Sequence, residues 1–163
     1  LSGMFRYNLQ KEQYLVPLKK EIEYIQSYLL LLKKRYGEGF TAIFELDHTL
    51  DEYPVPHIFL QPLIENCIVH GSCAGQEKLD IIIRTLQTET EKLIIIKNTG
   101  NILSREQVKE LNDMVQREFE VGKQERVKTL QNINFRLKTA CSGQCGLNFE
   151  FDENYVVLKI RIG

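Results

Sequence analysis

The side chains best suited to chemistry lie in one segment, Leu60–Gly71, which reads Leu-Gln-Pro-Leu-Ile-Glu-Asn-Cys-Ile-Val-His-Gly. Asn66 and His70 are four residues apart and share one face of a helix, and Glu65 lies about 100° away around the helix axis. An asparagine oxygen suits a hard cation such as Mg²⁺, and a histidine can donate to an anionic oxygen. Taken alone, such a pair more often consists of an asparagine bonded to local backbone and a histidine satisfied within the core.

A second candidate is the turn Lys97–Asn101, where Gly100 permits a positive φ or a close approach of backbone. Alone, this turn is typical of an ordinary connection from a strand to a helix. The sequence contains no P-loop, no G-x-G-x-x-G after a strand and no G-x-S-x-G. The four cysteines, at 67, 73, 141 and 145, match no common zinc or thioredoxin spacing. We therefore expect four reduced thiols.

Composition describes an ordinary globular domain. The 163 residues carry 21 Lys and Arg against 22 Asp and Glu, and 43% are hydrophobic. With a net charge of −1 the chain has no excess of basic residues, so we expect no nucleic-acid partner. No apolar run in the sequence approaches the roughly 20 residues that a membrane span needs, and no secretory signal is visible at the N-terminus.

The spacing of apolar residues predicts the elements that position these side chains. Pro17 is well placed to open a long helix, and Ser104 with Gln107 forms a capping box. In order, we expect a short helix within 1–14, a helix over 17–36, a strand over 40–46, a buried helix over 58–70, strands over 79–88 and 92–98, a helix over 104–117, a helix over 127–140, and strands over 147–151 and 156–162. Hairpins interleaved with helices predict a two-layer α/β sandwich with a mixed sheet.

Leu60–Gly71 resembles the N box of the GHKL ATP-binding fold, in the form used by sensor histidine kinases of the LytS/YesM type. There the run is similar to L-Q-P-L-V-E-N-A-I-K-H-G, and this sequence matches ten of the twelve places if isoleucine is allowed for valine, departing at Cys67 and Val69. Three further segments resemble the family's L-R-Y-x-L, L-x-x-E…Y…R-F-G and L-x-N-V-x-x-R-L runs, namely Phe5–Leu9, Pro17–Gly37 and Leu130–Leu137. The resemblance covers essentially the whole chain.

This resemblance implies a fold and a division of the chain. The fold would be the Bergerat two-layer α/β sandwich, with a mixed, mostly antiparallel sheet covered on one face by helices and an N-terminal helical appendage. Residues 1–36 would lead from an upstream dimerisation and phosphoacceptor region, and residues 37–163 would form the ATP-binding catalytic domain. A lid at about 118–128 would close over the nucleotide, and we expect it to be the most mobile internal segment without nucleotide.

The resemblance also implies roles for the N-box residues. Asn66 would ligate Mg²⁺ that bridges the ATP phosphates, and His70 would contact a phosphate. Glu65 would organise the water shell of the metal or take part in a proton relay. Relatives that hydrolyse ATP place a glutamate four residues before the metal asparagine, where this sequence has Pro62. The resemblance therefore favours phosphoryl transfer over ATP hydrolysis.

The glycine boxes depart from the family pattern. In the first box, D-x-G-x-G, Asn98 replaces the adenine-binding aspartate and Gly100 is kept. An asparagine can still accept from the adenine amine and could donate to the adjacent ring nitrogen. In the second box, Val127 and Thr129 replace glycines, which puts backbone approach to the phosphates in doubt. Lys123 and Arg126 lie beside them and could supply positive charge to the phosphates, although a solvated basic loop is at least as consistent with these residues.

The implied function is that of the catalytic, ATP-binding region of a bacterial two-component sensor. It would transfer the γ-phosphoryl group of ATP to a histidine on an upstream helix of the same or a dimer-related chain. A response regulator would then accept the phosphoryl group from that histidine. We expect a homodimeric, membrane-anchored full-length protein with this region in the cytoplasm, and no autophosphorylation of this chain alone. The alternative is a degenerate domain that binds nucleotide weakly or not at all and serves dimerisation or signalling.

Overall fold

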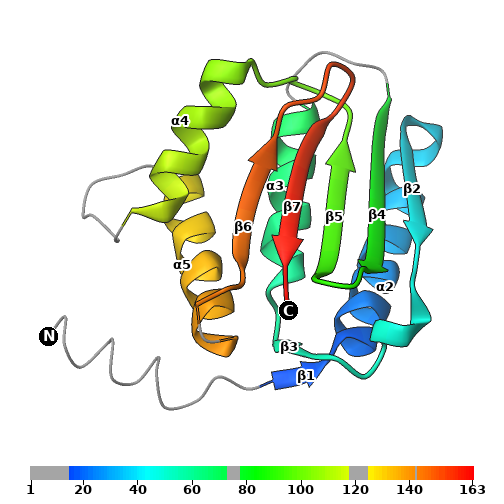
Figure 1. Ribbon diagram of the computed structural model, residues 1–163. Helices are drawn as coiled ribbons and strands as arrows, with labels where there is room; N and C mark the ends of the chain where they lie inside the picture. Colours follow the sequence, from blue (N-terminus) through cyan, green and yellow to red (C-terminus); the bar gives the residue numbers. More distant parts are fainter. Residues whose placement is uncertain (1–14, 73–77, 118–124, 142) are drawn as a thin grey trace, which may run out of the picture.

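The computed structural model describes residues 15–72, 78–117, 125–141 and 143–163 (Figure 1). The helix expected within residues 1–14 lies outside the described residues. The elements, in chain order, are β1 (Leu15–Pro17), α2 (Leu18–Tyr36), η1 (Gly37–Gly39), β2 (Phe40–Glu45), η2 (His48–Leu50), β3 (Pro54–Pro56), α3 (Leu60–Ser72), β4 (Leu79–Gln87), β5 (Lys92–Asn98), α4 (Arg105–Gln116), α5 (Glu125–Ala140), β6 (Gly146–Glu150) and β7 (Val156–Arg161).

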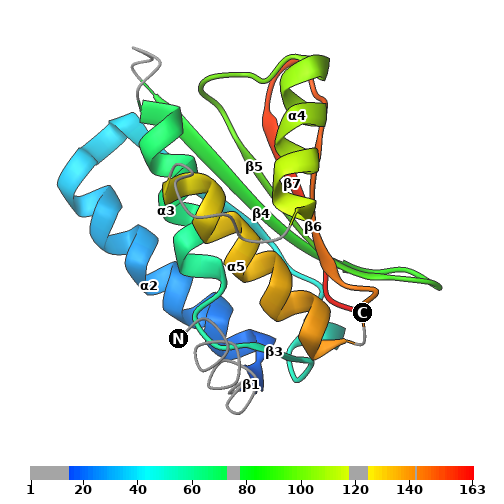
Figure 2. The ribbon, with the colours of Figure 1, turned by 90° about the vertical axis from the view of Figure 1, so that its left-hand side faces the viewer.

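The main sheet has five strands in the order β2-β4-β5-β7-β6. Only the β2–β4 pairing is parallel, and the other neighbours are antiparallel. Helices α2, α3 and α5 lie on one face of this sheet, and α4 lies beside β6 and α5 (Figure 2). The expected two-layer sandwich, with a mixed and mostly antiparallel sheet, is therefore confirmed.

Helix α2 forms where the proline was expected to open it. Pro17 is the N-cap, and the backbone N–H groups of Leu18 and Lys19 donate to the carbonyls of Tyr53 and Asp51, which satisfies the first orphan donors of the helix. The apolar stripe of α2 is buried in the same core as the sheet and α3. The proposed division of the chain between residues 36 and 37 stays a prediction. Helix α2, which lies before this division, packs in the same hydrophobic core as the residues after it.

Two expectations fail in the second half of the chain. The expected lid extended to residue 128, but α5 already begins at Glu125, so residues 125–128 are helical and that part of the prediction is wrong. Residues 118–124 lie outside the described residues. The expectation of four reduced thiols is also wrong, because Cys141 and Cys145 form a disulfide with Cα atoms 5.8 Å apart. The turn between α5 and β6, with Gly143 at φ 90°, brings these two cysteines together.

A smaller antiparallel sheet, β1 with β3, was not expected and lies in the proline-containing connector. It holds the start of α2 beside the segment that leads into α3. None of the helices in the described ranges has both the length and the apolar content needed to cross a membrane.

Candidate functional site

The start of α3 is held by one buried carboxylate from α2. Glu21 is 3% exposed, and its Oε1 accepts from the backbone N–H of Ile58 at 2.7 Å. Its Oε2 accepts from the N–H groups of Phe59 at 3.2 Å and Leu60 at 3.4 Å. Ile58 has φ 53°, a conformation that a β-branched side chain rarely adopts. Glu21 therefore caps α3 and stabilises the strained turn that sets the helix's direction.

The other end of α3 is in backbone contact with the turn after β5. A Cβ on Gly100, which has φ 135°, would lie 2.5 Å from the Cα of Gly71. The side chain of Asn101 also donates to the carbonyl of His70 at 3.3 Å. Glycine is required at position 100 because its φ is positive and a side chain would meet the Gly71 backbone, whereas a Cβ on Gly71 would first meet Cδ1 of Leu79. This contact joins the two segments that the sequence singled out.

A cavity of about 370 Å³ lies beside this contact, between α3, β5, β7, α4 and α5. Asn66 and His70 enter it from one face of α3, as their four-residue spacing predicts. Asn98 enters from the end of β5, and Arg126 enters from the first turn of α5. Four of the residues proposed from the sequence, distant along the chain, thus line one cavity.

Asn98 presents an acceptor to this cavity. The residue is 4% exposed, and its Nδ2 donates to the carbonyl of Thr99 at 2.8 Å. Thr99 is fixed in turn, because its Oγ1 accepts from the N–H of Asp80 at 2.9 Å. With one of its two amide N–H groups used in this way, Asn98 keeps its side-chain carbonyl oxygen to accept a hydrogen bond from a ligand. The bond to Thr99 uses only one of the two N–H groups of Nδ2, so the expected second role, donation to an adenine ring nitrogen, is compatible with it.

Positive charge enters the cavity through Arg126. Its Nε is buried and has no hydrogen-bond partner among the described residues. Burial, followed by the charge of Arg126, lowers the pKa of His70 from its ordinary value. Neutral imidazole therefore predominates at neutral pH and can still donate from one nitrogen. Burial also raises the pKa of the Cys67 thiol to about 12, so this thiol is unreactive.

Three of the proposed residues do not line the cavity. Glu65 is exposed, and its carboxylate accepts from Gln61 at 2.9 Å on another side of α3. Thr129 lies within α5, and its hydroxyl donates to the carbonyl of Glu125. Gly100 shapes the neighbouring turn, as described above. A fourth residue, Lys123, lies outside the described residues.

Sequence reasoning missed the opposite wall of the cavity. Val156 and Leu158 from β7 supply apolar surface there, and Gln107 from α4 lies near them. The register Asn98–Val156 explains the placement, because residues two apart on a strand share a face. Strand alternation predicts that Val156 and Leu158 share a face, but no local pattern predicts that β7 pairs with β5.

The donor set of the cavity limits what kind of metal it can hold. No group of three or more His, Cys, Asp or Glu side chains with the geometry of a metal site occurs among the described residues. Mg²⁺ often takes only one or two protein ligands and the rest from phosphates and water. A single asparagine oxygen, Asn66, beside a buried unpartnered arginine nitrogen therefore fits Mg²⁺ that arrives with a polyphosphate.

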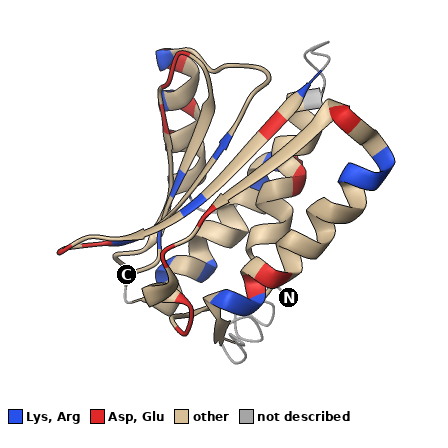
Figure 3. Cartoon of the chain, turned by 90° about the vertical axis from the view of Figure 1, so that its right-hand side faces the viewer, with Lys and Arg blue, Asp and Glu red and all other residues tan. Residues whose placement is uncertain are grey.

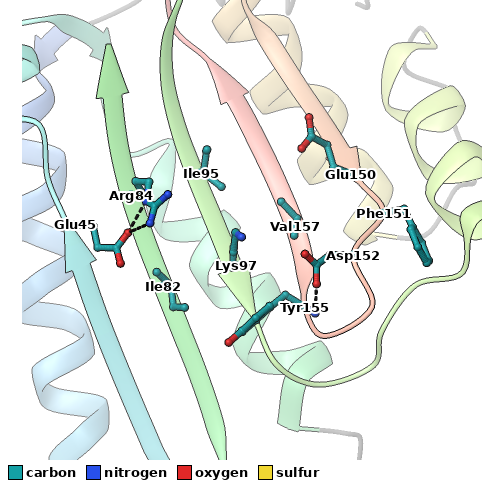
Figure 4. Close-up of a pocket in the computed structure, with 10 residues that line it drawn as sticks. All are labelled: Glu45, Ile82, Arg84, Ile95, Lys97, Glu150, Phe151, Asp152, Tyr155 and Val157. Carbon is teal, nitrogen blue, oxygen red and sulfur yellow. Dashed lines mark hydrogen bonds and ion pairs between the residues drawn. The ribbon is translucent and has the colours of Figure 1, made fainter. Parts of the chain in front are cut away.

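A second hollow of about 370 Å³ lies on the sheet face opposite the helices (Figure 4). Its floor includes Ile82, Ile95 and Val157, and Lys97 lies 5.7 Å from the ring centroid of Tyr155. It contains none of the residues proposed for chemistry. We therefore take the cavity beside Asn66 as the candidate site.

Comparison with known proteins relates this chain to the histidine kinases. A family model described as Histidine kinase matches residues 1–40. The sensor histidine kinase/phosphatase LytS of Staphylococcus aureus strain Mu50 is 30% identical over 153 residues, and LytS of strain NCTC 8325 gives the same values. The match covers 92% of this chain and 25% of the relative, so the chain spans about a quarter of the length of the curated relatives it matches. The resemblance noted in the sequence is confirmed.

Solved structures show the same fold. A nucleotide-free catalytic domain of histidine kinase ThkA gives a TM-score of 0.63 at 17% identity, covering 93% of this chain and 96% of that chain. Histidine kinase ThkA in complex with the response regulator protein TrrA gives a TM-score of 0.59 at 17% identity, covering 99% of this chain and 45% of that chain. The fold is that of a histidine kinase catalytic domain.

Proposed function

We propose that this chain, a homologue of the LytS sensor histidine kinases, binds Mg·ATP and donates its γ-phosphoryl group to a histidine upstream of residue 1. The observation that carries the proposal is the meeting of Asn66, His70, Asn98 and Arg126 in one cavity. The homology and the fold agree with it. The transfer breaks the bond between the γ-phosphorus and the β–γ bridging oxygen, forms a bond from phosphorus to an imidazole nitrogen, and leaves ADP.

Adenine binding is assigned to the inner end of the cavity. There the carbonyl oxygen of Asn98 accepts from the exocyclic amine, while Val156 and Leu158 offer apolar contact to the base. Guanine carries an oxygen where adenine carries the amine. To donate to that oxygen, the Asn98 amide would have to turn over and lose its bond to Thr99. This arrangement supports adenine as the preferred base.

Phosphate binding is assigned to the end that contains Arg126. Its unpartnered Nε and the positive charge of its guanidinium suit anionic oxygens. His70 is positioned one helical turn beyond Asn66 and donates to a phosphate oxygen as neutral imidazole. Arg126 thereby supplies the charge that lysine provides at the place of Val69 in the family pattern. The charged donor that is missing from α3 is thus supplied by α5.

Asn66 is the proposed protein ligand for Mg²⁺, whose chemistry is to neutralise charge that develops on the phosphates during transfer. Asn66 holds this position because α3 is fixed at its start by Glu21 and at its end by Gly71. Because Glu65 lies outside the cavity, it would organise the water shell of the metal or relay a proton only through intervening water. The residues of this chain therefore act mainly by positioning and by charge.

The partners proposed are those of a two-component sensor. An upstream phosphoacceptor helix, of the same chain or of a dimer-related chain, supplies the histidine, and a response regulator accepts the phosphoryl group from it. Histidine kinase ThkA in complex with the response regulator protein TrrA is an example of such a pair. We propose further that the full-length protein is a membrane-anchored homodimer and that this region lies in the cytoplasm.

The test uses a longer form of the protein that includes the upstream histidine. Incubation with Mg·ATP labelled at the γ-phosphate should label the protein with an acid-labile, base-stable phosphate, which is the behaviour of phosphohistidine. The Asn66→Ala variant should lose the label, and Asn148→Ala, which changes an exposed asparagine on β6, should keep it. Wild-type protein that binds no nucleotide and takes up no label would instead support a degenerate signalling domain.

A further inference from the structure

The edge of β6 is closed by side chains. The backbone N–H and carbonyl of Phe149 bond to the side-chain amide of Asn112, at 2.7 Å and 2.8 Å. The N–H of Leu147 donates to Oδ1 of Asn134 at 2.8 Å, and its carbonyl accepts from Gln116 at 3.1 Å. The outward backbone groups of these two residues are therefore satisfied by α4 and α5. No further strand can pair there without displacing them.

The opposite edge, β2, has no such cover. Within the described ranges, β2 pairs with β4 alone, and no side chain is hydrogen-bonded to the backbone of Phe40–Glu45. This strand also contains neither proline nor lysine, residues that often protect an edge from pairing. In Figure 3 the molecule is seen from the side on which β2 lies, and α2 runs along the helical face of the sheet. The edge is open.

The side chains of β2 suit burial at an interface. On the face away from the helices, Ile43 is 44% exposed, which is unusual for a large apolar residue in a strand. The one charged residue of the strand, Glu45, forms an ion pair with Arg84 of the neighbouring strand (Figure 4). The edge therefore presents an apolar centre, and its single charge is already neutralised within the chain.

We propose that β2 pairs antiparallel with β2 of a second copy of this chain, about a two-fold axis at Ile43. In this register Ile43 faces its own copy, and Thr41 faces Glu45 of the partner subunit. On the helical face, Ala42 lies opposite the larger Phe44 of the partner subunit. The two five-stranded sheets become one continuous sheet.

The sequence of β2 favours this register over its neighbours. An axis at Phe44 would place the two Phe44 rings directly opposite each other and would set Ile43 against Glu45 of the partner subunit. An axis at Ala42 would leave Glu45 beyond the end of the partner strand. A second copy is the occupant that fits, because the strand is complementary to itself and each sheet has one open edge. Such a contact closes as a dimer rather than growing as a fibre.

This interface lies away from the cavity, whose strands are β5 and β7. Pairing through β2 therefore leaves the candidate nucleotide site unobstructed. The proposal stands independently of the proposed function, and a change at the edge should leave nucleotide binding unaltered.

Cysteine cross-linking tests the pairing and its register. Directly opposed residues have Cα atoms about 4.5–5.5 Å apart, within the range that a disulfide spans. Under mild oxidation, Ile43→Cys should give a covalent dimer on a non-reducing gel. Glu45→Cys should not, because the two copies of residue 45 lie four residues, roughly 13 Å, apart along the paired strands. The wild-type chain, with its native cysteines, gives the background.

A mixture of Thr41→Cys and Glu45→Cys chains should form the mixed dimer, because these positions face each other. Equal cross-linking at residues 43 and 45, or none above background at residue 43, would overturn the proposed register and pairing. The latter result would also follow if another segment of the same chain occupied this edge.

Sedimentation measures the strength of the association. Ile43→Lys places two ammonium groups face to face and should weaken dimerisation at least tenfold. Ile95→Lys makes the same change on the same sheet face but on β5, away from the edge, and should dimerise like the wild type. Calorimetry with Mg·ATP should give the same affinity for Ile43→Lys as for the wild type. A wild-type chain that stays monomeric at about 0.5 mM, near the weak end of measurable affinities, would overturn the proposal.

Discussion

Replacing Glu21 by glutamine tests how the candidate site is built. Glutamine keeps the shape of the side chain but offers one acceptor oxygen in place of two. Whichever way the amide turns, an NH₂ group faces backbone N–H donors that a carboxylate oxygen accepted, either that of Ile58 or those of Phe59 and Leu60. The loss of stability should be large because Glu21 is only 3% exposed, and water therefore cannot replace the lost hydrogen bonds.

The magnitude follows from the bonds lost. A hydrogen bond to a charged group contributes about 1.5–3 kcal/mol, and one or two such bonds are broken, so we expect Glu21→Gln to lower the free energy of unfolding by about 3 kcal/mol. For a chain of this size that corresponds to a fall in Tm of about 6–12 °C. Urea unfolding followed by circular dichroism measures the change, and the slope m should stay constant.

Glu23→Gln is the matched control on the same helix. Glu23 is exposed and pairs with Lys20 at 3.3 Å, and exposed pairs of this kind contribute at most about 0.5 kcal/mol. If Glu21→Gln and Glu23→Gln lower stability by the same small amount, Glu21 does not cap α3 and the reasoning is refuted. Glu21→Gln should also weaken Mg·ATP binding, because Asn66 and His70 depend on the position of α3.

Three further predictions concern the same region. Gly100→Ala should lower the free energy of unfolding by more than Gly37→Ala in urea titrations. Both variants add the strain of a positive φ, about 1–3 kcal/mol, but only the Cβ at residue 100 would also meet the Cα of Gly71; equal costs would contradict the close approach. The pKa of His70 is lowered in the folded state, so the unfolded state binds its proton first and stability falls as pH drops through 6.5. His70→Gln should therefore lose less Tm than the wild type between about pH 7.5 and about pH 5.5; a His70→Gln profile identical to the wild type would count against the assignment. Because burial raises the pKa of Cys67 to about 12, iodoacetamide should label it slowly in the folded chain and quickly after denaturation, as read by peptide mass spectrometry; rapid labelling of the folded chain would show that the thiol is accessible.

Much of this architecture could be predicted from the sequence because its signals are local. The apolar spacing of α2, the alternation along β4 and β5, and the capping box at Ser104 each depend on residues within one element. The meeting of Asn66 with Asn98 could be expected only through the resemblance to a known family. No property of the two residues themselves places them in one cavity.

The parts that could not be predicted depend on long-range contacts. The cap on α3 comes from Glu21, 37 residues before Ile58, and the amides that close β6 come from two different helices. Helix α5 begins at Glu125, two residues before the expected start, and this difference has a local cause. Where the family has glycines, this chain has Val127 and Thr129, and the loss of flexible glycines lets the helix extend toward its N-terminus. That extension also carries Arg126 into the cavity.

Calorimetric titration of the chain with ATP, with and without Mg²⁺, tests the central claim most directly. We predict Mg·ATP binding with a Kd in the micromolar to millimolar range, about −4 to −8 kcal/mol. Asn66→Ala should abolish the difference between Mg·ATP and metal-free ATP, and Asn98→Ala should weaken both. The Asn148→Ala variant, at an exposed asparagine, should match the wild type. The absence of any heat from the wild type at millimolar Mg·ATP, or a full Mg²⁺ dependence retained by Asn66→Ala, would contradict the account.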